Sequence, residues 1–356
     1  MTPAVPLKAA ERSVADPGEL VDVARPALSL RGRAGRLGGA LTSPKYGPVL
    51  VTLALLVLIF AVGGSRYPGF LSAQVILNLL VDNAYLIVLA VGMTFVILTG
   101  GIDLSVGAVV ALSTMIAASL LQAGWPAAVV VPLILVLTSL LGLAVGLMIQ
   151  VFKVQPFIAT LAAMFLARGL CYVISSRSIS ITDPFFVAAA QTRIPLGPEL
   201  SLSASAVVSV LVVAVAVVVL HLTRFGRTVY ALGGGEQSAL LMGLPVARTK
   251  IVVYVVSGLC SGLSGILFSF YTLSGYSLTA IGTELDAIAA VVIGGTLLTG
   301  GYGFVLGSLL GVLVLGTIQT LISFDGTLSS WWTRIFIGAL LLVFMVLQKI
   351  LTARRR

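Results

Sequence analysis

Charged side chains are scarce in this chain and make up 9% of its 356 residues. A soluble globular domain carries about 25%. Hydrophobic residues make up 59% of the chain and the mean hydropathy is +1.15, which excludes a soluble globular protein. Long hydrophobic runs are typical of membrane-spanning helices. The sequence therefore predicts an all-α, polytopic membrane protein.

Residues that carry out chemistry are also few. The two cysteines, Cys171 and Cys260, fall in separate hydrophobic runs, so the sequence offers no disulfide framework and no paired-cysteine metal site. The single histidine, His221, has no cysteine or carboxylate near it in sequence to complete a zinc site. A phosphate-binding loop of the form G-x-x-x-x-G-K-[ST] is absent. We expect no metal and no cofactor in this chain, and any ATPase must be a separate polypeptide.

About ten hydrophobic runs have the length, roughly 17–25 residues, that crosses a bilayer as a helix. They are 48–64, 74–99, 104–122, 127–151, 156–175, 205–222, 250–271, 284–299, 303–322 and 331–350. We assign residues 48–350 to one transmembrane domain. Residues 1–47 lack periodicity and predict a disordered basic cytoplasmic tail, and residues 351–356 form a basic cytoplasmic end.

The positions of the cations predict the orientation, because short cytoplasmic loops retain Lys and Arg. Most of the 21 lysines and arginines fall in cytoplasmic segments if the N-terminus is inside. An even number of helices then places both termini in the cytoplasm. We interpret the net charge of +9 as a topology signal and an attraction to anionic membrane lipid, and not as nucleic-acid binding.

Several glycines are spaced four residues apart within the hydrophobic runs. This spacing gives a helix a smooth stripe where a neighbouring backbone can approach closely. The glycines concerned are Gly142/Gly146, Gly258/Gly262 and Gly303/Gly307/Gly311. They predict tight helix packing and say little about a substrate.

The longest predicted cytoplasmic connection is residues 223–250. The three glycines at 233–235 permit a sharp turn. The following EQSALLMGL predicts about two turns of helix, with Leu240, Leu241 and Leu244 on its apolar side, before a proline ends it. Such a helix needs a partner surface. It lies either on the membrane or its own chain, or in a groove of a cytoplasmic protein.

Three stretches resemble one known family. They are VGMTFVILTGGIDLSVGAVVAL at 91–112, FGRTVYALGGGEQSALLMGLPVARTKI at 225–251 and ELDAIAAVVIGGTLLTGGYGFVLGSLLGVL at 284–313. They resemble the permease subunits of bacterial ATP-binding-cassette (ABC) importers for monosaccharides, the ribose, xylose and galactose group. Three further stretches look like the galactofuranose branch of that family, whose importers pair two different permease chains. These are RSISITDPF at 177–185, SFYTLSGYSLTAIGTELDAIA at 269–289 and SFDGTLSSWWTRIFIG at 323–338.

The resemblance implies a transport subunit and not an enzyme, with the type II, vitamin-importer-like permease fold, in the bacterial inner membrane. It implies three partners: a cytoplasmic ABC ATPase, a periplasmic sugar-binding protein and a second permease chain, either a different homologue or a second copy. The ATPase would dock at the 223–250 loop. The docking candidates are Gly233, Gly234, Gly235, Glu236, Gln237, Leu241, Gly243 and Pro245.

Three other functions remain as alternatives. The chain could serve an importer for ribose or for another pentose or hexose. A proton-coupled secondary sugar transporter would need a coupling carboxylate, such as Asp82 or Asp103, deep in the bilayer. A structural membrane scaffold would leave the 223–250 loop unexplained.

Asp103 lies in the stretch LTGGIDLSVG at 98–107, which LTGGYGFVLG echoes at 298–307. Either Asp103 or Ser105 caps the following helix at a cytoplasmic turn, or the helices break deeper and Asp103 faces the sugar path or the ATPase side of its gate. We expect Gly100 and Gly101 to end the preceding helix. Both copies fall on the predicted cytoplasmic side, which favours turn chemistry over an inverted repeat.

Polar and aromatic residues within or beside the hydrophobic runs are candidates for the substrate path. They are Asn78, Asp82, Asn83, Asp103, Arg168, Glu284, Asp286, Gln319, Trp331 and Trp332. We expect an ion pair between Arg168 and the carboxylates of Glu284 and Asp286.

The two tryptophans follow a predicted turn at Asp325 and Gly326. Ser329 and Ser330 are candidates to cap the last helix. The indoles belong either to the interfacial aromatic belt or to the path. Because adjacent helical residues point about 100° apart, we expect one ring to face the helix bundle.

Overall fold

The computed structural model describes residues 47–195, 200–327, 329 and 331–353. The predicted tail at 1–47, apart from Gly47, lies outside these residues, as do 354–356 of the predicted basic end and the capping candidate Ser330.

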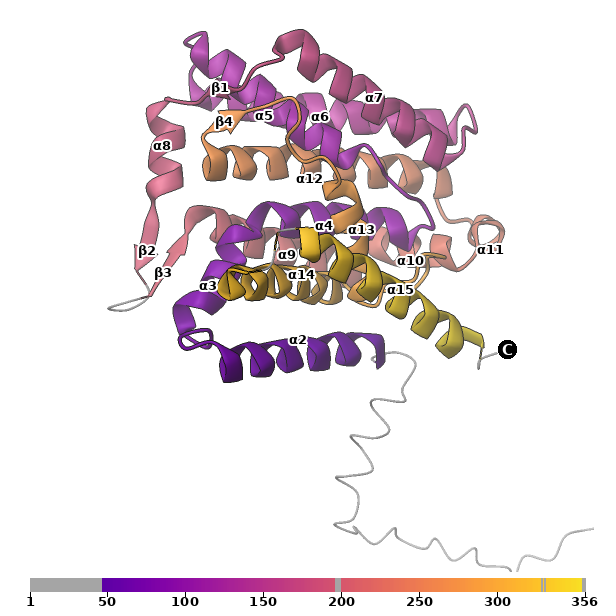
Figure 1. The fold of residues 1–356 in the computed structure, drawn as a ribbon. Coiled ribbons are helices and arrows are strands. Elements are labelled where there is room, and N and C mark those ends of the chain that lie inside the picture. Colours follow the sequence, from indigo (N-terminus) through magenta and orange to yellow (C-terminus); the bar gives the residue numbers. More distant parts are fainter. Residues whose placement is uncertain (1–46, 196–199, 328, 330, 354–356) are drawn as a thin grey trace, which may run out of the picture. The chain divides into compact units, whose positions relative to one another are not determined.

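The described chain is almost entirely helical (Figure 1). Its first helices are α2 (Gly47–Arg66), α3 (Ala73–Asp82), α4 (Ala84–Leu98), α5 (Val106–Gln122), α6 (Ala127–Gln150), α7 (Pro156–Ile174) and α8 (Pro184–Gln191). The others are α9 (Ala204–Leu222), α10 (Arg224–Gly234), α11 (Glu236–Leu241), α12 (Val246–Thr272), α13 (Thr283–Ile293), α14 (Val305–Asp325) and α15 (Trp331–Ala353). Every hydrophobic run predicted to cross the membrane overlaps at least one of these helices.

Length and composition divide these helices into two groups. Six helices, α2, α6, α7, α9, α12 and α14, are long and apolar enough to cross a membrane, and the bent pair α3 and α4 makes a seventh span. Helices α5 and α15 are shorter apolar helices within the described residues. The protein is thus an all-helical polytopic membrane protein, as predicted, with some of its spans broken or short.

Two of the predicted runs are not continuous helices. The run at 74–99 bends by 58° between α3 and α4. Asn83 lies at the bend, where its Nδ2 donates to the Leu79 carbonyl over 2.9 Å. The run at 284–299 holds only the eleven-residue helix α13, because Gly294 and Gly295 end it (Gly295 φ +92°). Apolar residues continue on both sides of each break, so hydropathy does not reveal it.

Two short antiparallel ladders accompany the helices. Strand β1 (Ile179–Ser180) pairs with β4 (Ser274–Gly275), and β2 (Arg193–Pro195) pairs with β3 (Ser201–Ser203). The ladders lie with α8 at one end of the bundle, called here the α8 end (Figure 1). Helices α10 and α11 lie at the opposite end, called here the α11 end.

Helix α12 forms the centre of the bundle and packs against α6, α4 and α5 (Figure 1). Glycines make this approach close. A Cβ on Gly142 of α6 would overlap the Tyr254 carbonyl of α12, and one on Gly258 of α12 would overlap the Thr138 carbonyl of α6. These contacts confirm the packing role predicted from the glycine spacing.

Helices α5 and α13 both begin inside the bundle, after non-helical stretches. Figure 1 shows α13 starting part-way along the bundle and not at the α8 end. The starts of the two helices touch, since a Cβ on Gly107 would lie 2.8 Å from the Ala280 carbonyl and 3.3 Å from the Glu284 nitrogen. Irregular backbone at this depth is tolerated where protein surrounds it or where it lines a cavity.

Three glycine runs meet at the α11 end and form what we call the glycine junction. The runs are 98–101, 233–235 and 298–301. The Gly301 nitrogen donates to the Leu98 carbonyl over 2.8 Å. A Cβ on Gly233 would overlap both of these atoms, and one on Gly300 would lie 2.7 Å from the Gly100 nitrogen. The echoed LTGG stretches are therefore in direct contact with each other and with α10.

The junction also explains the individual glycines. Gly100 (φ +77°) and Gly101 end α4, as predicted, with their nitrogens donating to the Ile97 and Val96 carbonyls over 2.9 and 3.1 Å. Gly300 has a similar φ of +84°, which confirms turn chemistry as the reason for the echo. Of the three glycines predicted to make a sharp turn, only Gly235 lies outside a helix and separates α10 from α11, whereas α10 continues through Gly234 and Gly233 serves close approach instead.

The junction predicts different costs for two neighbouring substitutions. A methyl group at Gly233 would displace backbone, whereas one at Gly234 would meet no atom within 4 Å. We expect Gly233→Ala to lower the melting temperature of the purified chain by roughly 3–10 °C, the shift that an overpacking cost of about 1–3 kcal/mol produces. Gly234→Ala is the matched control and should keep the wild-type value. Equal melting temperatures for the two variants would contradict the junction.

Candidate functional site

A cavity of about 610 Å³ lies between α13, α14 and α15, and we call it the α15 pocket. Three of the predicted path residues line it: Asp286, Gln319 and Trp331. The other lining residues are Ile322, Ser323, Gly326, Thr333, Arg334 and Ile337. Carboxylate, amide, hydroxyl and guanidinium groups therefore share the pocket with an indole ring and aliphatic side chains.

Helix starts supply the two charged groups of the α15 pocket. Asp286 lies in the first turn of α13. It is within electrostatic range of Arg334 in the first turns of α15, and also of Glu284. The Arg334 guanidinium lies against the turn before α13, where a Cβ on Gly282 would be 2.9 Å from its Nη1. Arg334 was not among the site residues predicted from the sequence. A cation inside an apolar run is nevertheless expected to pair with a carboxylate or a backbone carbonyl.

A second, smaller cavity of about 220 Å³ holds Asp82, and we call it the α3 pocket. Its lining includes Arg193, which is within electrostatic range of Asp82, and the aromatic residues Tyr85 and Tyr271. Tyr85 is in turn within electrostatic range of Asp286. Tyr85 therefore lines the α3 pocket and is also close to a charged residue of the α15 pocket.

Other predicted path residues serve the fold. Asn78 is exposed and accepts a bond from Gln74 over 2.8 Å. Asn83 is buried at the α3–α4 bend. Trp332 packs on Phe336, with ring centroids 6.0 Å apart, and does not line the α15 pocket.

Glu284 faces α5 and not a cavity. Its Oε1 accepts a bond from the Gly282 nitrogen over 3.2 Å. Its other carboxylate oxygen would overlap a Cβ placed on Gly107. The side chain therefore fixes the start of α13 against the start of α5.

Arg168 does not form the ion pair expected with Glu284 and Asp286. Its Nη1 donates to the Ser277 and Thr279 carbonyls, over 2.6 and 2.8 Å. The physical reason is the non-helical stretch before α13, whose carbonyls have no helical partners inside the bundle. Arg168 therefore holds this stretch in place from α7.

Asp103 is buried, with 4% of its surface exposed. Its Oδ1 accepts bonds from the Ser105 nitrogen (2.9 Å) and hydroxyl (2.6 Å), and its Oδ2 accepts one from the Ser257 hydroxyl (2.7 Å). Ser257 lies well inside α12, so the break is deeper than a turn at the bundle end. Neither predicted side-chain cap forms at the start of α5, and Asp103 lines neither pocket.

The predicted short helix of the 223–250 loop is present as α11. Its apolar residues differ from the prediction: Leu240 and Leu241 face outward, the latter 90% exposed, whereas Leu244 packs inward with Leu232. Gly243 (φ +72°) ends the helix, and the next nitrogen donates to the Ala239 carbonyl over 3.1 Å. Helix α11 thus presents the exposed apolar side chains of Leu240 and Leu241, and a backbone hydrogen bond closes its C-terminal end.

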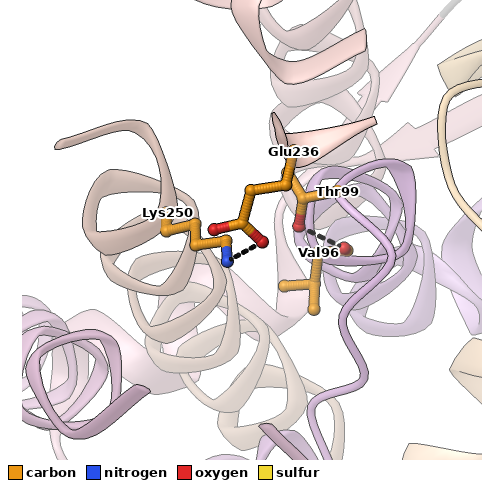
Figure 2. A network of polar contacts seen from close by, with 4 residues as sticks. All are labelled: Val96, Thr99, Glu236 and Lys250. Carbon is orange, nitrogen blue, oxygen red and sulfur yellow. Dashed lines mark hydrogen bonds and ion pairs between the residues drawn. The ribbon is translucent and has the colours of Figure 1, made fainter. Parts of the chain in front are cut away.

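Glu236 at the start of α11 pairs with Lys250 of α12 over 2.6 Å. Figure 2 shows this pair beside the end of α4, where the Thr99 hydroxyl donates to the Val96 carbonyl over 2.8 Å. Among the other docking candidates, Gln237 is exposed and Pro245 directly precedes α12.

Tyr230 ties α10 to the turn before α14. Its hydroxyl donates to the Gly303 carbonyl over 2.8 Å. Burial raises the pKa of Tyr230 to about 12, so the hydroxyl keeps its proton and remains a donor at physiological pH.

Within the described residues, no group of three histidine, cysteine or acidic side chains is arranged to hold a metal ion. His221 instead stacks on Phe304, with ring centroids 5.8 Å apart, and its Nδ1 lies 3.1 Å from the Val217 carbonyl.

Comparisons with known proteins identify the family. Residues 75–345 match the family described as "Branched-chain amino acid transport system / permease component". The chain is 48% identical to the inner membrane ABC transporter permease protein YjfF of Escherichia coli and 42% identical to the fructose import permease protein FruG of Bifidobacterium longum. It is 38% identical to the ribose import permease protein RbsC of Bacillus subtilis. Each match covers 86% of this chain and 92% of the relative. No solved structure matches the chain significantly. The chain therefore belongs to this family of permease components and is the permease subunit of an ABC transporter.

Proposed function

We propose that this permease moves a monosaccharide, galactofuranose, into the cytoplasm by alternating access, driven by a separate ATPase. The observation that carries the proposal is the α15 pocket. Sugars bind through hydroxyl groups to carboxylate, amide and guanidinium groups, and through their C–H faces to aromatic rings. Asp286, Gln319, Arg334 and Trp331 supply these groups around one cavity of about 610 Å³, within the usual size range of ligand pockets.

The relatives support a sugar over a branched-chain amino acid, although the family description names the latter. Two relatives carry fructose and ribose in their names.

The choice of galactofuranose rests on the sequence resemblance at 177–185, 269–289 and 323–338. The last of these segments supplies Trp331 and Arg334 to the α15 pocket, and the second supplies Asp286. The stretches that carry the resemblance thus contribute the pocket's charged and aromatic groups. Ribose or another pentose or hexose is the alternative within the same pocket chemistry.

Three partners complete the proposal. The ATPase docks on the exposed Leu240, Leu241 and Met242 of the α11 end. A periplasmic sugar-binding protein delivers substrate at the α8 end. A second permease chain, a different homologue or a second copy, completes the transporter.

The orientation follows from the cations. Arg224, Arg227, Arg248 and Lys250 lie in the segments of the α11 end, which makes that end cytoplasmic by the positive-inside rule. Both termini are then cytoplasmic, in an inner membrane, as the name of the E. coli relative has it for that protein.

A proton-coupled transporter is the competing mechanism. Its coupling carboxylate would be Asp82, which lines the α3 pocket, or Asp103. Asp103 already accepts hydrogen bonds from two serines, an arrangement that suits a structural role. The energy source therefore separates the two mechanisms experimentally.

Uptake by reconstituted transporter tests the function. The chain is placed in proteoliposomes with its ATPase, binding protein and second permease, and is offered labelled galactofuranose, ribose, fructose and leucine. We expect ATP-dependent uptake of galactofuranose, at least about tenfold above leucine, because the sugar's hydroxyl groups and C–H face match the several polar groups and the indole ring of the pocket. Preferred leucine uptake would contradict a sugar permease. Uptake that persists without ATP and collapses with a proton uncoupler would contradict an ATP-driven one.

The adjacent tryptophans test the α15 pocket. Trp331 lines the pocket, whereas Trp332 packs on Phe336. We expect Trp331→Ala to lower sugar uptake roughly threefold to tenfold, through the loss of an aromatic contact of about 0.5–1.5 kcal/mol. Trp332→Ala should mainly lower the thermal stability. Both are measured at matched amounts of protein in the membrane. Equal, small losses of uptake in the two variants would contradict a role of Trp331 in the pocket and would indicate that both rings only anchor the chain in the membrane.

The docking surface is tested by Leu241→Ser. Because Leu241 is 90% exposed, the fold should tolerate the change, while ATPase affinity should fall about tenfold or more if a partner buries this side chain. The charge exchange Glu236→Lys with Lys250→Glu is the companion variant. It keeps an ion pair that contributes at most about 1 kcal/mol but removes the carboxylate from the start of α11. Normal ATPase binding and uptake in both variants would exclude docking at α11.

A further inference from the structure

A third cavity, of about 770 Å³, opens beside α11, and we call it the arginine pocket. It is bounded by α10, by the turn after α11 and by the start of α12. Its cationic lining residues are Arg224, Arg227 and Arg248. The α15 pocket lies between other helices and shares no lining residue with it.

The described residues offer the three arginines no compensating charge. None of the described residues that line the cavity is acidic. Glu236 is the only carboxylate in the 223–250 loop, and Lys250 already pairs with it. Within the part of the chain that the structure describes, none of the three guanidinium groups forms a hydrogen bond or ion pair with protein. Three exposed guanidinium groups around one cavity favour an anionic ligand with several oxygens.

The rest of the cavity is mostly apolar, and Thr228 and Thr249 are its other polar residues. Phe225, Ala231, Met242, Leu244 and Val252 supply most of its remaining wall. A free phosphate or a carboxylate would use only the arginines and leave this wall uncovered. The lining therefore suits an amphipathic ligand whose charged group carries a hydrocarbon chain.

The place of the cavity in the chain indicates the source of that ligand. Arg224 begins α10 directly after Thr223, the residue that follows the spanning helix α9, and Arg248 lies in the first turn of the spanning helix α12. Arg224 and Arg248 therefore lie where two candidate membrane-spanning helices end, on the side that we propose to be cytoplasmic. Basic side chains close to the end of a spanning helix attract anionic lipid head groups.

We propose that the arginine pocket binds an anionic phospholipid, with the phosphate between Arg224, Arg227 and Arg248 and the upper part of an acyl chain against Phe225 and Val252. The bound lipid connects α10 to the start of α12 across the cavity. An acidic segment of the ATPase is the other class of anion that could reach the arginines, because Met242 belongs both to this wall and to the proposed docking surface. The variants described below separate the lipid from the ATPase.

Native mass spectrometry of the purified full-length chain tests the site. The chain is titrated with phosphatidylglycerol, with phosphatidylcholine of the same acyl chains and with glycerol phosphate. We expect saturable binding of one phosphatidylglycerol, at least about tenfold tighter than phosphatidylcholine, because the arginines attract the net negative head group. Equal binding of the two lipids would overturn the proposal. Glycerol phosphate binding as tightly as phosphatidylglycerol would also overturn it, since the site would then take a free anion.

Paired variants with the same loss of charge locate the binding. Arg224→Gln with Arg248→Gln should abolish the preference for phosphatidylglycerol, whereas Arg66→Gln with Arg177→Gln, which lie outside the pocket, should keep it. Arg224→Lys with Arg248→Lys retains the charge and controls for misfolding of the glutamine variant. It should weaken lipid binding only partly, because lysine keeps the positive charge but lacks the planar guanidinium group that binds a phosphate through two hydrogen bonds. Equal loss in the first two variants would exclude the arginine pocket. Loss of ATPase binding with unchanged lipid preference would assign the pocket to the partner protein instead.

Discussion

The close backbone approach at the glycine junction is the contact on which the α11 end depends. The bond from the Gly301 nitrogen to the Leu98 carbonyl joins two turns that are far apart in sequence, and Gly233 of α10 lies against both. A side chain at Gly233 would separate all three segments. The ends of α4, α10 and the turn before α14 are therefore held as one unit, and α11 extends directly from it.

This unit adjoins the two irregular stretches inside the bundle. Beyond Gly101 the chain runs to Asp103, which is fixed by Ser257, and then into α5. The start of α5 meets the start of α13, one turn from Asp286 in the α15 pocket. Packed contacts thus lead from the exposed Leu241 to the proposed sugar site. A contiguous route of this kind permits coupling, whose strength is a free energy that double-mutant cycles measure.

Much of this architecture could be predicted from the sequence, because it depends on local composition. Hydropathy located the six helices that are long enough to cross a membrane and the bent pair α3 and α4, although it predicted ten spans. Glycine spacing identified the α6–α12 contact. The breaks at Asn83 and Gly294 were missed, because apolar residues flank them. The partners of Arg168 were missed for another reason. They are the backbone carbonyls of Ser277 and Thr279, which lack helical partners only because no helix forms there, and side-chain chemistry does not reveal such a gap. Of the site, Asp286, Gln319 and Trp331 were candidates, but only the fold brings them to one cavity with Arg334.

The hydroxyl of Tyr254 is a buried polar group beside the glycine junction. It lies close to Gly101, where a Cβ would be 2.6 Å from it, and it has no hydrogen-bond partner among the described residues. A buried unpaired hydroxyl costs about 1–3 kcal/mol. Asp103 accepts three bonds here and has capacity for about four. A small movement of residues 101–103 that brought these two groups together would recover that cost. The unsatisfied hydroxyl beside the junction thus offsets part of the stability of the arrangement described here. The proposed alternating access would require a second arrangement of similar free energy.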